Sequence, residues 1–288
     1  MISIIICSRK PDIPESLQDN ITDTIGLDYE LIIIDNSNYK YSIFQAYNEG
    51  ARLSKYPYLC FMHDDILFHT QDWGKKVISH FNKPIVGLIG IAGSHYVPRL
   101  PGAHWSTGIS SRQIRHTIGG KTQHDFYRYS DNNEASLQAI IIDGLWMCIS
   151  NEVLKKVRFD DITFSGFHCY DSDICLQIIK ANYEVRIVFD IDIEHFSLGL
   201  RNKIWLENLF IFFNKWKHEL PLASIEIPGR EISEANYTNA REIIEQLKIN
   251  KSGYFNILKV WFNYIRINPP VNSRNIKYGF SLMKRTLQ

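Results

Sequence analysis

Three short polar clusters contain residue types that can bind metal ions or move protons. They are His63-Asp64-Asp65, Asp171-Ser172-Asp173 and His195. The first comes directly after the apolar run 58–62, the second precedes a run with helical spacing, and the third follows the run 185–189. Mg²⁺ and Mn²⁺ prefer carboxylate oxygens, and Mn²⁺ also accepts imidazole. The clusters therefore predict a divalent metal site for a diphosphate, with a carboxylate nearby that can act as a general base.

Each cluster also has a purely structural interpretation. An aspartate after a strand is a common turn residue. Asp171 or Ser172 could cap the helix that follows, with Asp173 in its first turn. A single histidine is more often a structural hydrogen-bonding group than a ligand. The residues alone leave both interpretations open, so the predicted elements around them matter.

The first part of the chain alternates strand and helix patterns. Residues 2–7, 29–34 and 58–62 are apolar and rich in β-branched residues, as in strands buried on both faces, and residues 14–25 and 43–53 have helical spacing. Such repeats predict a right-handed parallel α/β sheet, which binds ligands outside the carboxyl ends of its strands. The polar residues that follow the three strands all belong to that edge.

The rest of the chain continues this pattern with one interruption. Residues 94–135 have weak periodicity and predict a loop-rich or hairpin insertion near the site. Further strands are predicted at 85–91, 145–150 and 185–189, and further helices at 73–81, 151–157, 174–181, 204–216 and 233–247. The clearest shift in composition lies near residues 221–230, which predicts a boundary there.

The order of these motifs resembles the family 2 glycosyltransferases of GT-A fold. The resemblance rests on the strand 2–7, Ile34-Asp35-Asn36-Ser37, the segment 46–51, His63-Asp64-Asp65, Asp143-Gly144 with Trp146, Tyr170-Asp171-Ser172-Asp173 and His195. It covers residues 1–220 and implies a GT-A catalytic domain with a mostly parallel central sheet flanked by helices. Residues 221–288 would then form a basic, helical C-terminal extension.

The resemblance also implies roles for individual residues. The metal ligands would be His63, Asp65 and His195, and the nucleotide-sugar site would include Ser8, Arg9, Asp35, Asp64 and Trp146. Asp171 matches the catalytic base, and Trp146 would stack on a sugar on the acceptor side. Two positions depart from the family pattern, since His63 replaces the first acid of the metal motif and Tyr170 replaces the glutamate before the base.

The implied activity is the metal-dependent transfer of a sugar from a nucleotide-diphosphate sugar to an acceptor hydroxyl. The ion would be Mn²⁺ or Mg²⁺, and the reaction a direct displacement that inverts the anomeric centre. A saccharide or lipid-linked acceptor fits bacterial-type polysaccharide or glycolipid synthesis. Four residues near the insertion are candidate contacts for it: His95, His104, Trp105 and Arg112.

Two other function classes remain as alternatives. A nucleotidyltransferase needs the same sheet and metal-bound acids, but it usually has a glycine-rich phosphate loop after the first strand, and residues 7–11 contain no glycine. The same absence disfavours a NAD-dependent oxidoreductase. A non-catalytic nucleotide-sugar binding module would be expected to lack Asp65 or Asp171, and both are present.

Charge is distributed unevenly along the 288 residues, which carry a formal net charge of +1. Residues 1–250 carry a net charge of −6 and residues 251–288 carry +7, so the main body is too acidic for a general nucleic-acid binder. The aromatic, basic segment 254–267 predicts either a terminal helix packed on the body or an interfacial helix on an anionic membrane.

Targeting signals and cysteines suggest the compartment. No apolar run approaches the roughly 18 residues of a membrane span, and the N-terminus reads as a strand rather than a signal peptide. Five cysteines without a CxxC spacing predict reduced thiols. These features predict a cytoplasmic protein, and an interfacial segment 251–288 would make it peripheral on the inner face of the membrane.

Overall fold

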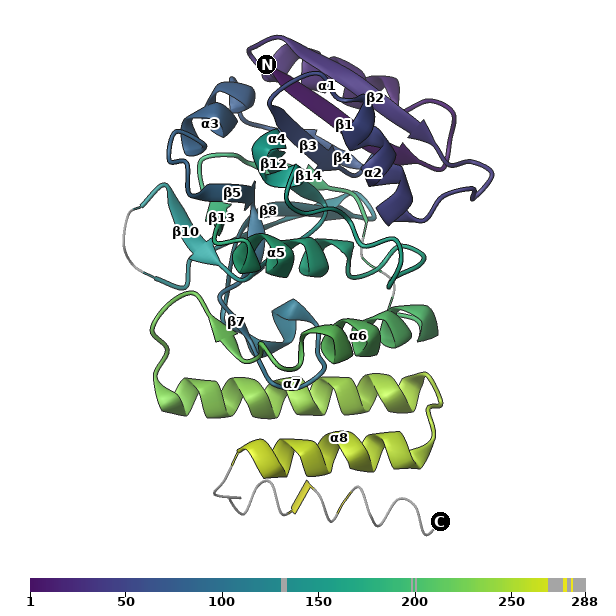
Figure 1. The fold of residues 1–288 in the computed structure, drawn as a ribbon, viewed down its shortest axis with the longest axis vertical. Helices are drawn as coiled ribbons and strands as arrows, with labels where there is room; N and C mark the ends of the chain where they lie inside the picture. Colours follow the sequence, from purple (N-terminus) through teal and green to yellow (C-terminus); the bar gives the residue numbers. More distant parts are fainter. Residues whose placement is uncertain (131–133, 198, 200, 269–276, 279–280, 282–288) are drawn as a thin grey trace.

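The three predicted N-terminal strands lie side by side in the computed structural model, which describes residues 1–288 except 131–133, 198, 200, 269–276, 279–280 and 282–288 (Figure 1). Strand β1 (Ile2–Ser8) pairs in parallel with both β2 (Tyr29–Asp35) and β3 (Tyr58–Met62). The polar residues that follow them therefore meet at one edge of the sheet.

The full central sheet has seven strands in the order β10-β13-β5-β12-β3-β1-β2. Strand β12 (Trp146–Ser150) runs antiparallel between β3 and β5 (Val86–Gly90), and β13 (Glu184–Val188) is parallel to β5. Strand β10 (Ser136–Ala139) is the antiparallel edge. Only β10 and β12 oppose the common direction, so the predicted mostly parallel sheet is confirmed.

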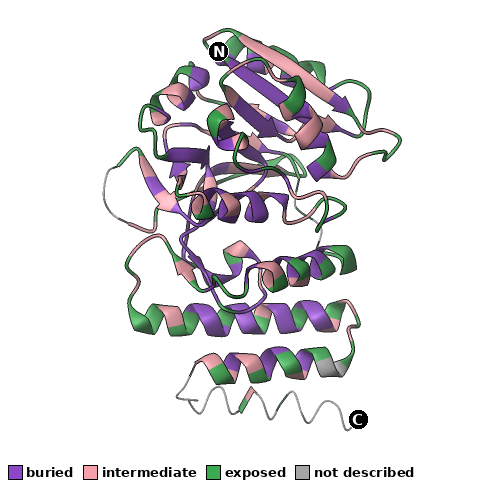
Figure 2. Cartoon of the chain, viewed as in Figure 1, coloured by how far each residue is buried: buried purple, intermediate pink, exposed green. Residues whose placement is uncertain are grey.

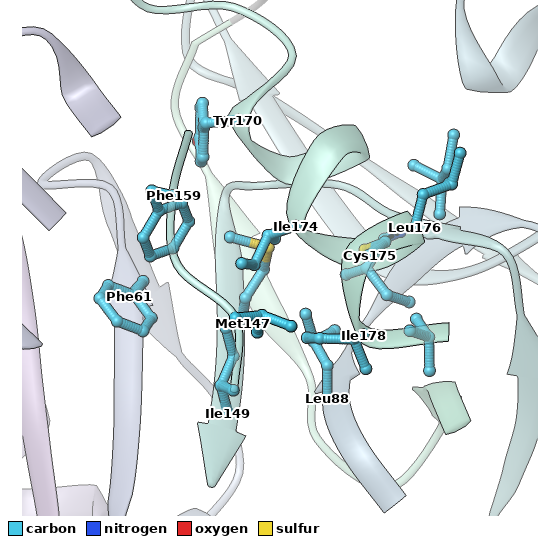
Figure 3. Close-up of a cluster of buried hydrophobic side chains, with 14 of the residues drawn as sticks. Phe61, Leu88, Met147, Ile149, Phe159, Tyr170, Ile174, Cys175, Leu176 and Ile178 are labelled. Carbon is cyan, nitrogen blue, oxygen red and sulfur yellow. Dashed lines mark hydrogen bonds between the residues drawn. The ribbon is translucent and has the colours of Figure 1, made fainter. Parts of the chain in front are cut away.

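Helices cover both faces because successive side chains of a strand point to opposite sides. Ile4 of β1 belongs to the core shared with α1 (Glu15–Thr24) and α3 (Trp73–His80). Ile5 belongs to the opposite core, with α2 (Ile43–Leu53) and α5 (Tyr170–Lys180). Figure 3 shows this second core, in which Ile174 and Ile178 of α5 face Met147 and Leu88 of the strands. The short helix α4 (Asn151–Leu154) follows β12.

A second sheet arises where the sequence predicted an insertion. Its order is β11-β6-β8-β14-β4, and β9 (Lys121–Tyr127) pairs with β8 (Ser110–Ile118) as an antiparallel hairpin. The other members are β4 (Ile66–Phe68), β6 (Ala92–Ser94), β11 (Ile141–Ile142) and β14 (Ile193–His195). The predicted hairpin is confirmed, but its union with β4 and β14 into a sheet depends on partners distant in sequence.

Three helices stack beyond the central sheet: α6 (Lys203–Trp216), α7 (Gly229–Ile249) and α8 (Tyr254–Ile267) (Figure 1). Leu209 of α6, Ile243 of α7 and Trp261 of α8 share one apolar cluster. Strand β15 (Leu222–Ala223) pairs with β7 (Tyr96–Val97), and the short 3-10 helix at His104–Thr107 lies next to α7. The predicted extension thus shares its core with residues before position 220.

The apolar side of α8 is covered by the protein itself. Ile257, Val260, Trp261 and Tyr264 are buried, and Figure 2 shows buried residues along α7 as well. This packing matches the first of the two interpretations of segment 254–267. In the described part of the chain, no helix is both long and apolar enough to span a membrane.

Two of the five cysteines form a disulfide. Cys60 of β3 and Cys148 of β12 lie directly opposite each other in the antiparallel pair and are bonded across 88 residues of sequence. The prediction of reduced thiols is wrong for this pair, because no local spacing signals a cross-strand contact of that separation; Cys7, Cys169 and Cys175 are free thiols. Disulfides persist mainly in oxidising compartments, so cysteine usage no longer supports the predicted cytoplasmic location.

Candidate active site

His63, Asp65 and His195 converge at the edge of the central sheet. One ligand atom from each lies within 4.8 Å of the other two. Oδ1 of Asp65 is 3.4 Å from Nε2 of His195 and 3.8 Å from Nδ1 of His63. His63 follows β3, and His195 arrives through the antiparallel pairing of β14 with β4, in which it lies opposite Ile66. The pairing thereby brings His195 next to Asp65, which precedes it by 130 residues in the sequence.

The hydrogen-bond pattern around His63 suits a metal ligand. The Tyr170 hydroxyl lies 3.1 Å from the carbonyl oxygen of Gly144, which can only accept, and 2.9 Å from Nε2 of His63. When the hydroxyl donates its single proton to Gly144, it accepts from Nε2–H. Nδ1 then keeps its lone pair on the side of Asp65. Burial, followed by the charge of His195, lowers the pKa of His63 and favours this neutral form.

The donor set at this point is two imidazole nitrogens and one carboxylate oxygen. Mn²⁺ accepts both atom types, whereas Mg²⁺ strongly prefers oxygen. The residues present therefore fit a manganese ion better than a magnesium ion.

Asp64 and Ser8 form a second contact at the same edge. The Ser8 hydroxyl donates to Oδ2 of Asp64 over 2.8 Å. Asp35 lies opposite Ser8 in the parallel pairing of β1 and β2, and it is exposed, as is Arg9. The backbone N–H of Ser37 donates to Asp35 and lowers the pKa of that carboxyl. Three of the predicted nucleotide-site residues are thus neighbours, with Arg9 following directly in sequence.

Asp171 is held in the first turn of α5, which begins four residues earlier than the predicted helix. Its Oδ2 accepts from the Gly144 N–H at 3.2 Å and its Oδ1 from the Ser172 N–H at 2.7 Å. Burial and then the neighbouring Asp143 raise the pKa of Asp171. A carboxylate whose proton affinity is raised is well suited to act as a base.

Gly144 joins Asp171 to the three-residue cluster. Its N–H bonds Asp171 and its carbonyl accepts from Tyr170, which in turn bonds His63. A Cβ at position 144 would lie 2.3 Å from the Tyr170 hydroxyl, so only glycine permits this approach. One hydrogen-bonded chain therefore runs from the base candidate to the metal-ligand candidates.

Asp173 points elsewhere, although it stands two residues from Asp171. Residues two apart in a helix do not share a face. Asp173 is 1% exposed, accepts from Trp216 Nε1 at 2.8 Å and pairs with Lys215 at 2.7 Å. It thus connects α5 to α6 and has a structural role.

Trp146 does not occupy the predicted position. Its side chain is fully buried, with ring centroids of Phe68 and Trp73 both 6.3 Å from its own. Neither face of the indole is open to a sugar, so the expected stacking role is corrected. The reason is local: β12 directs Trp146 into the core shared with α3.

His104 and Trp105, which the sequence named only as candidate contacts, lie beside the site. Nε2 of His104 is 3.7 Å from Oδ2 of Asp143. Burial opposes charge on both groups, but their mutual attraction outweighs it, so the pKa of His104 is raised and that of Asp143 is lowered. Trp105 is 38% exposed, packs edge-on against His104 and lies nearly parallel to Trp205.

The other two candidate contacts have structural partners. His95 is buried, with ring nitrogens 2.7 Å from the Gln138 carbonyl and 2.7 Å from the Ser111 hydroxyl. Arg112 pairs with Asp125 across the β8–β9 hairpin at 2.6 Å. The sequence marked Trp105 as an aromatic residue in a polar segment. Only the structure shows that Trp105 is partly exposed whereas Trp146 is buried.

Comparisons with known proteins bear on the fold and the family of the chain. No curated protein sequence matches the chain significantly. A crystal structure of GalNAc-T7 with UDP, GalNAc and Mn²⁺ matches with a TM-score of 0.50 and 10% identity, over 71% of this chain and 44% of that one. The crystal structure of A197 from STIV matches with a TM-score of 0.41 and 14% identity, over 68% and 86%.

The likeness to GalNAc-T7 is one of fold, and this chain spans less than half of that chain's length. The sequence family described as "Glycosyltransferase like family" matches residues 3–219, which is most of the chain. The chain therefore belongs to this glycosyltransferase-like family and has the GT-A fold.

Proposed function

We propose that the protein transfers a sugar from a nucleotide-diphosphate sugar to an acceptor hydroxyl in a metal-dependent, inverting reaction. One observation carries this proposal: the hydrogen-bonded chain from Asp171 through Gly144 and Tyr170 to His63. This chain of contacts supports the proposal because transfer to a hydroxyl needs a base close to the group that binds the diphosphate.

The proposed roles follow the geometry of the edge. Ser8, Arg9, Asp35 and Asp64 would line the nucleotide side, supported by the Ser8–Asp64 hydrogen bond and the pairing of β1 with β2. His63, Asp65 and His195 would hold Mn²⁺, with Mg²⁺ as the weaker fit. The ion, when bound, would neutralise charge on the departing diphosphate.

Asp171 would act on the acceptor. Its carboxylate takes the hydroxyl proton as the acceptor oxygen bonds to the anomeric carbon, and the bond from that carbon to the diphosphate oxygen breaks with its electron pair leaving on the diphosphate. Attack opposite the leaving group inverts the anomeric centre. The Gly144 and Ser172 N–H groups hold the carboxylate in place during this step.

One assay separates the three function classes. The protein is incubated with Mn²⁺, a panel of nucleotide sugars and a panel of saccharide and lipid-linked acceptors, and the released phosphates are measured. A glycosyltransferase releases nucleoside diphosphate, and a nucleotidyltransferase running in reverse with pyrophosphate releases nucleoside triphosphate. Binding without turnover on every donor and acceptor would identify a non-catalytic module and overturn the proposal.

Replacing Tyr170 by phenylalanine is expected to weaken Mn²⁺ binding about 10-fold, because groups that orient a metal ligand typically contribute 10- to 100-fold. The phenylalanine ring keeps the packing but cannot accept from His63 Nε2. Calorimetric titration with Mn²⁺ measures the change. Tyr96→Phe is the matched control. It removes another buried hydroxyl, which donates to Asn236 and contacts none of the metal-ligand candidates. Equal Mn²⁺ affinity in the two variants would contradict the role of Tyr170.

Trp105 is proposed as the sugar-stacking residue on the acceptor side, in place of Trp146. Its partly exposed ring, which the Arg201 guanidinium approaches to 5.2 Å, and its contact with His104 beside Asp143 support this. Trp105→Ala is expected to raise the acceptor KM up to about tenfold, with donor hydrolysis little changed. Phe126→Ala, which removes an exposed aromatic from β9, should leave the KM unchanged. An unchanged acceptor KM in Trp105→Ala would remove this assignment.

The acceptor remains a saccharide or a lipid-linked saccharide, in polysaccharide or glycolipid synthesis. Peripheral contact of residues 251–288 with a membrane is part of the same prediction. Deleting the segment is a poor test, because it would uncover the apolar residues Tyr237, Ile243, Ile244 and Leu247 of α7. Charge substitutions on the exposed side of α8 avoid this problem.

A further inference from the structure

Three segments distant in sequence enclose an open pocket of about 530 Å³ away from the residues of the active site. They are the loop after β7, the C-terminal end of α6 and one side of α8. Five basic residues line it: Arg99, Lys217, His218, Lys259 and Arg266. None of the lining residues is acidic.

The positive charge of this pocket is not neutralised by ion pairs within the described residues. No carboxylate there lies within 4.0 Å of a charged nitrogen of Arg99, Lys217, Lys259 or Arg266; the nearest acid in sequence, Glu219, pairs instead with Lys180 at 2.8 Å. Four lining cations without a carboxylate contact contrast with the net charge of −6 on residues 1–250. The pocket therefore attracts anions.

Helix ends explain only part of this arrangement. Lys217 and His218 follow the last turn of α6, and Arg266 lies in the last turn of α8, where cations are favourable. Lys259 lies in the middle of α8, and Arg99 comes from a loop. The Arg99 Nε donates to the Leu220 carbonyl at 2.7 Å, which fixes the guanidinium at the pocket. Lys259, Asn263 and Arg266 share one side of α8, at the spacing of helix neighbours.

The pocket also has apolar walls. Phe213 of α6 and Ile267 of α8 line it together with the basic residues. Guanidinium and ammonium groups bind phosphate oxygens through charge-assisted hydrogen bonds. A ligand that carries a phosphate next to a hydrocarbon portion would match both parts of the lining.

We propose that this pocket binds a phosphate-bearing ligand, either the headgroup of an anionic lipid or a soluble phosphate compound. The proposal goes beyond the transfer reaction, since no lining residue belongs to the metal or base candidates. If the ligand is a lipid, the pocket would anchor the enzyme where a lipid-linked acceptor is present.

Two probes distinguish the sources of the phosphate. The first is co-sedimentation with vesicles of phosphatidylcholine, alone or in equal parts with phosphatidylglycerol. The second is calorimetric titration with inorganic pyrophosphate. Both use the full chain at low ionic strength, because salt screens such contacts. Vesicle binding that requires phosphatidylglycerol indicates a lipid headgroup, and pyrophosphate binding without vesicle binding indicates a soluble phosphate.

The decisive variant is the double substitution Lys259→Gln with Arg266→Gln. Both side chains are exposed, so the packing of α8 on α7 is retained. Affinity for the probe that binds is expected to fall roughly 30-fold, while donor hydrolysis and thermal stability stay unchanged. The control is Lys251→Gln with Lys277→Gln, which removes the same charge from exposed residues outside the pocket.

Two results would overturn the proposal. One is a wild-type protein that binds neither probe. The other is an equal loss of affinity in both double variants, which would assign the effect to net charge alone. Asp65→Asn should retain full binding, so that a failure of the metal-site proposal would not affect this one.

Discussion

Replacing Asp171 by asparagine is expected to lower the rate of sugar transfer by about 10²–10⁴-fold while the protein stays folded. The amide can still accept from the Gly144 or Ser172 N–H, but it cannot take a proton from the acceptor. Release of nucleoside diphosphate in single-turnover assays measures the loss, and calorimetric titration with donor shows that binding is kept. Transfer near the wild-type rate would rule out Asp171 as the base.

The control for this experiment stands two residues away. Asp173→Asn removes the buried charge that accepts from Trp216 Nε1 and pairs with Lys215, while Lys215 keeps its second partner, Asp160. We expect a lower melting temperature with transfer retained in the protein that remains folded. The two variants thus separate chemistry from stability with the same chemical change.

The raised pKa of Asp171 also sets the direction of pH dependence. Transfer requires the carboxylate, so the rate should fall as the pH drops through a pKa above the ordinary aspartate value of 3.8. The folded protein holds this proton more tightly than the unfolded chain does. This group's contribution to stability therefore decreases as the pH rises through the same window. Asp171→Asn removes that contribution and is not expected to destabilise the protein at neutral pH.

The second large effect is expected for Asp65→Asn. Oδ1 of Asp65 lies within 4 Å of both histidines, so it contributes the only negative charge of the predicted ligand set. Loss of that charge should reduce Mn²⁺ affinity and lower transfer by about 10²–10³-fold, because a bound ion supplies several kcal/mol of charge stabilisation at the leaving group. Electron paramagnetic resonance of free Mn²⁺ measures binding directly.

Asp64→Asn is the matched control, because this neighbouring carboxylate bonds Ser8. It should retain Mn²⁺ binding and raise the donor KM. Chelation of the wild-type protein should abolish transfer, and added Mn²⁺ should restore it more effectively than Mg²⁺. Full transfer after chelation, or equal Mn²⁺ affinity in both variants, would show that Asp65 is not a metal ligand.

The two departures from the family pattern lie in contact with each other. His63 stands where the resemblance expects an acid, and Tyr170 where it expects a glutamate, and their side chains are 2.9 Å apart. When the phenol accepts from Nε2–H, Nδ1 keeps its lone pair on the side of Asp65. The pair would therefore provide a neutral ligand at the position where the resemblance expects an acid.

The sequence by itself determined the α/β sheet and the place of its site. Apolar runs at 2–7, 29–34 and 58–62 predicted neighbouring strands, and parallel strands bring the polar residues after them to one edge. The three parallel strands follow from that rule, whereas His195 reaches Asp65 through the pairing of β14 with β4 in the second sheet. Strands β1 and β3 are buried as predicted, whereas β2 is the edge strand and is mostly half-buried. The spacing of apolar residues along the sequence predicted these strands because it indicates which sides of an element are apolar.

Only the tertiary structure decided which side chain of each cluster faces the site. Asp65 joins the histidines while Asp64 bonds Ser8, and Asp171 bonds Gly144 while Asp173 pairs with Lys215. Neighbouring side chains diverge by a half turn along a strand, and residues two apart diverge similarly on a helix. A sequence-based prediction that misplaces a cluster by one residue therefore assigns the site role to the wrong aspartate.

Contacts between distant segments were also beyond local patterns. The Cys60–Cys148 disulfide, the burial of Trp146 and the exposure of Trp105 each depend on which strand or helix lies alongside. The basic pocket likewise combines distant segments, because the loop at Arg99 and the end of α6 line it together with α8. Composition determined that the segment is basic, but packing against α7 determined which of its charges face solvent together.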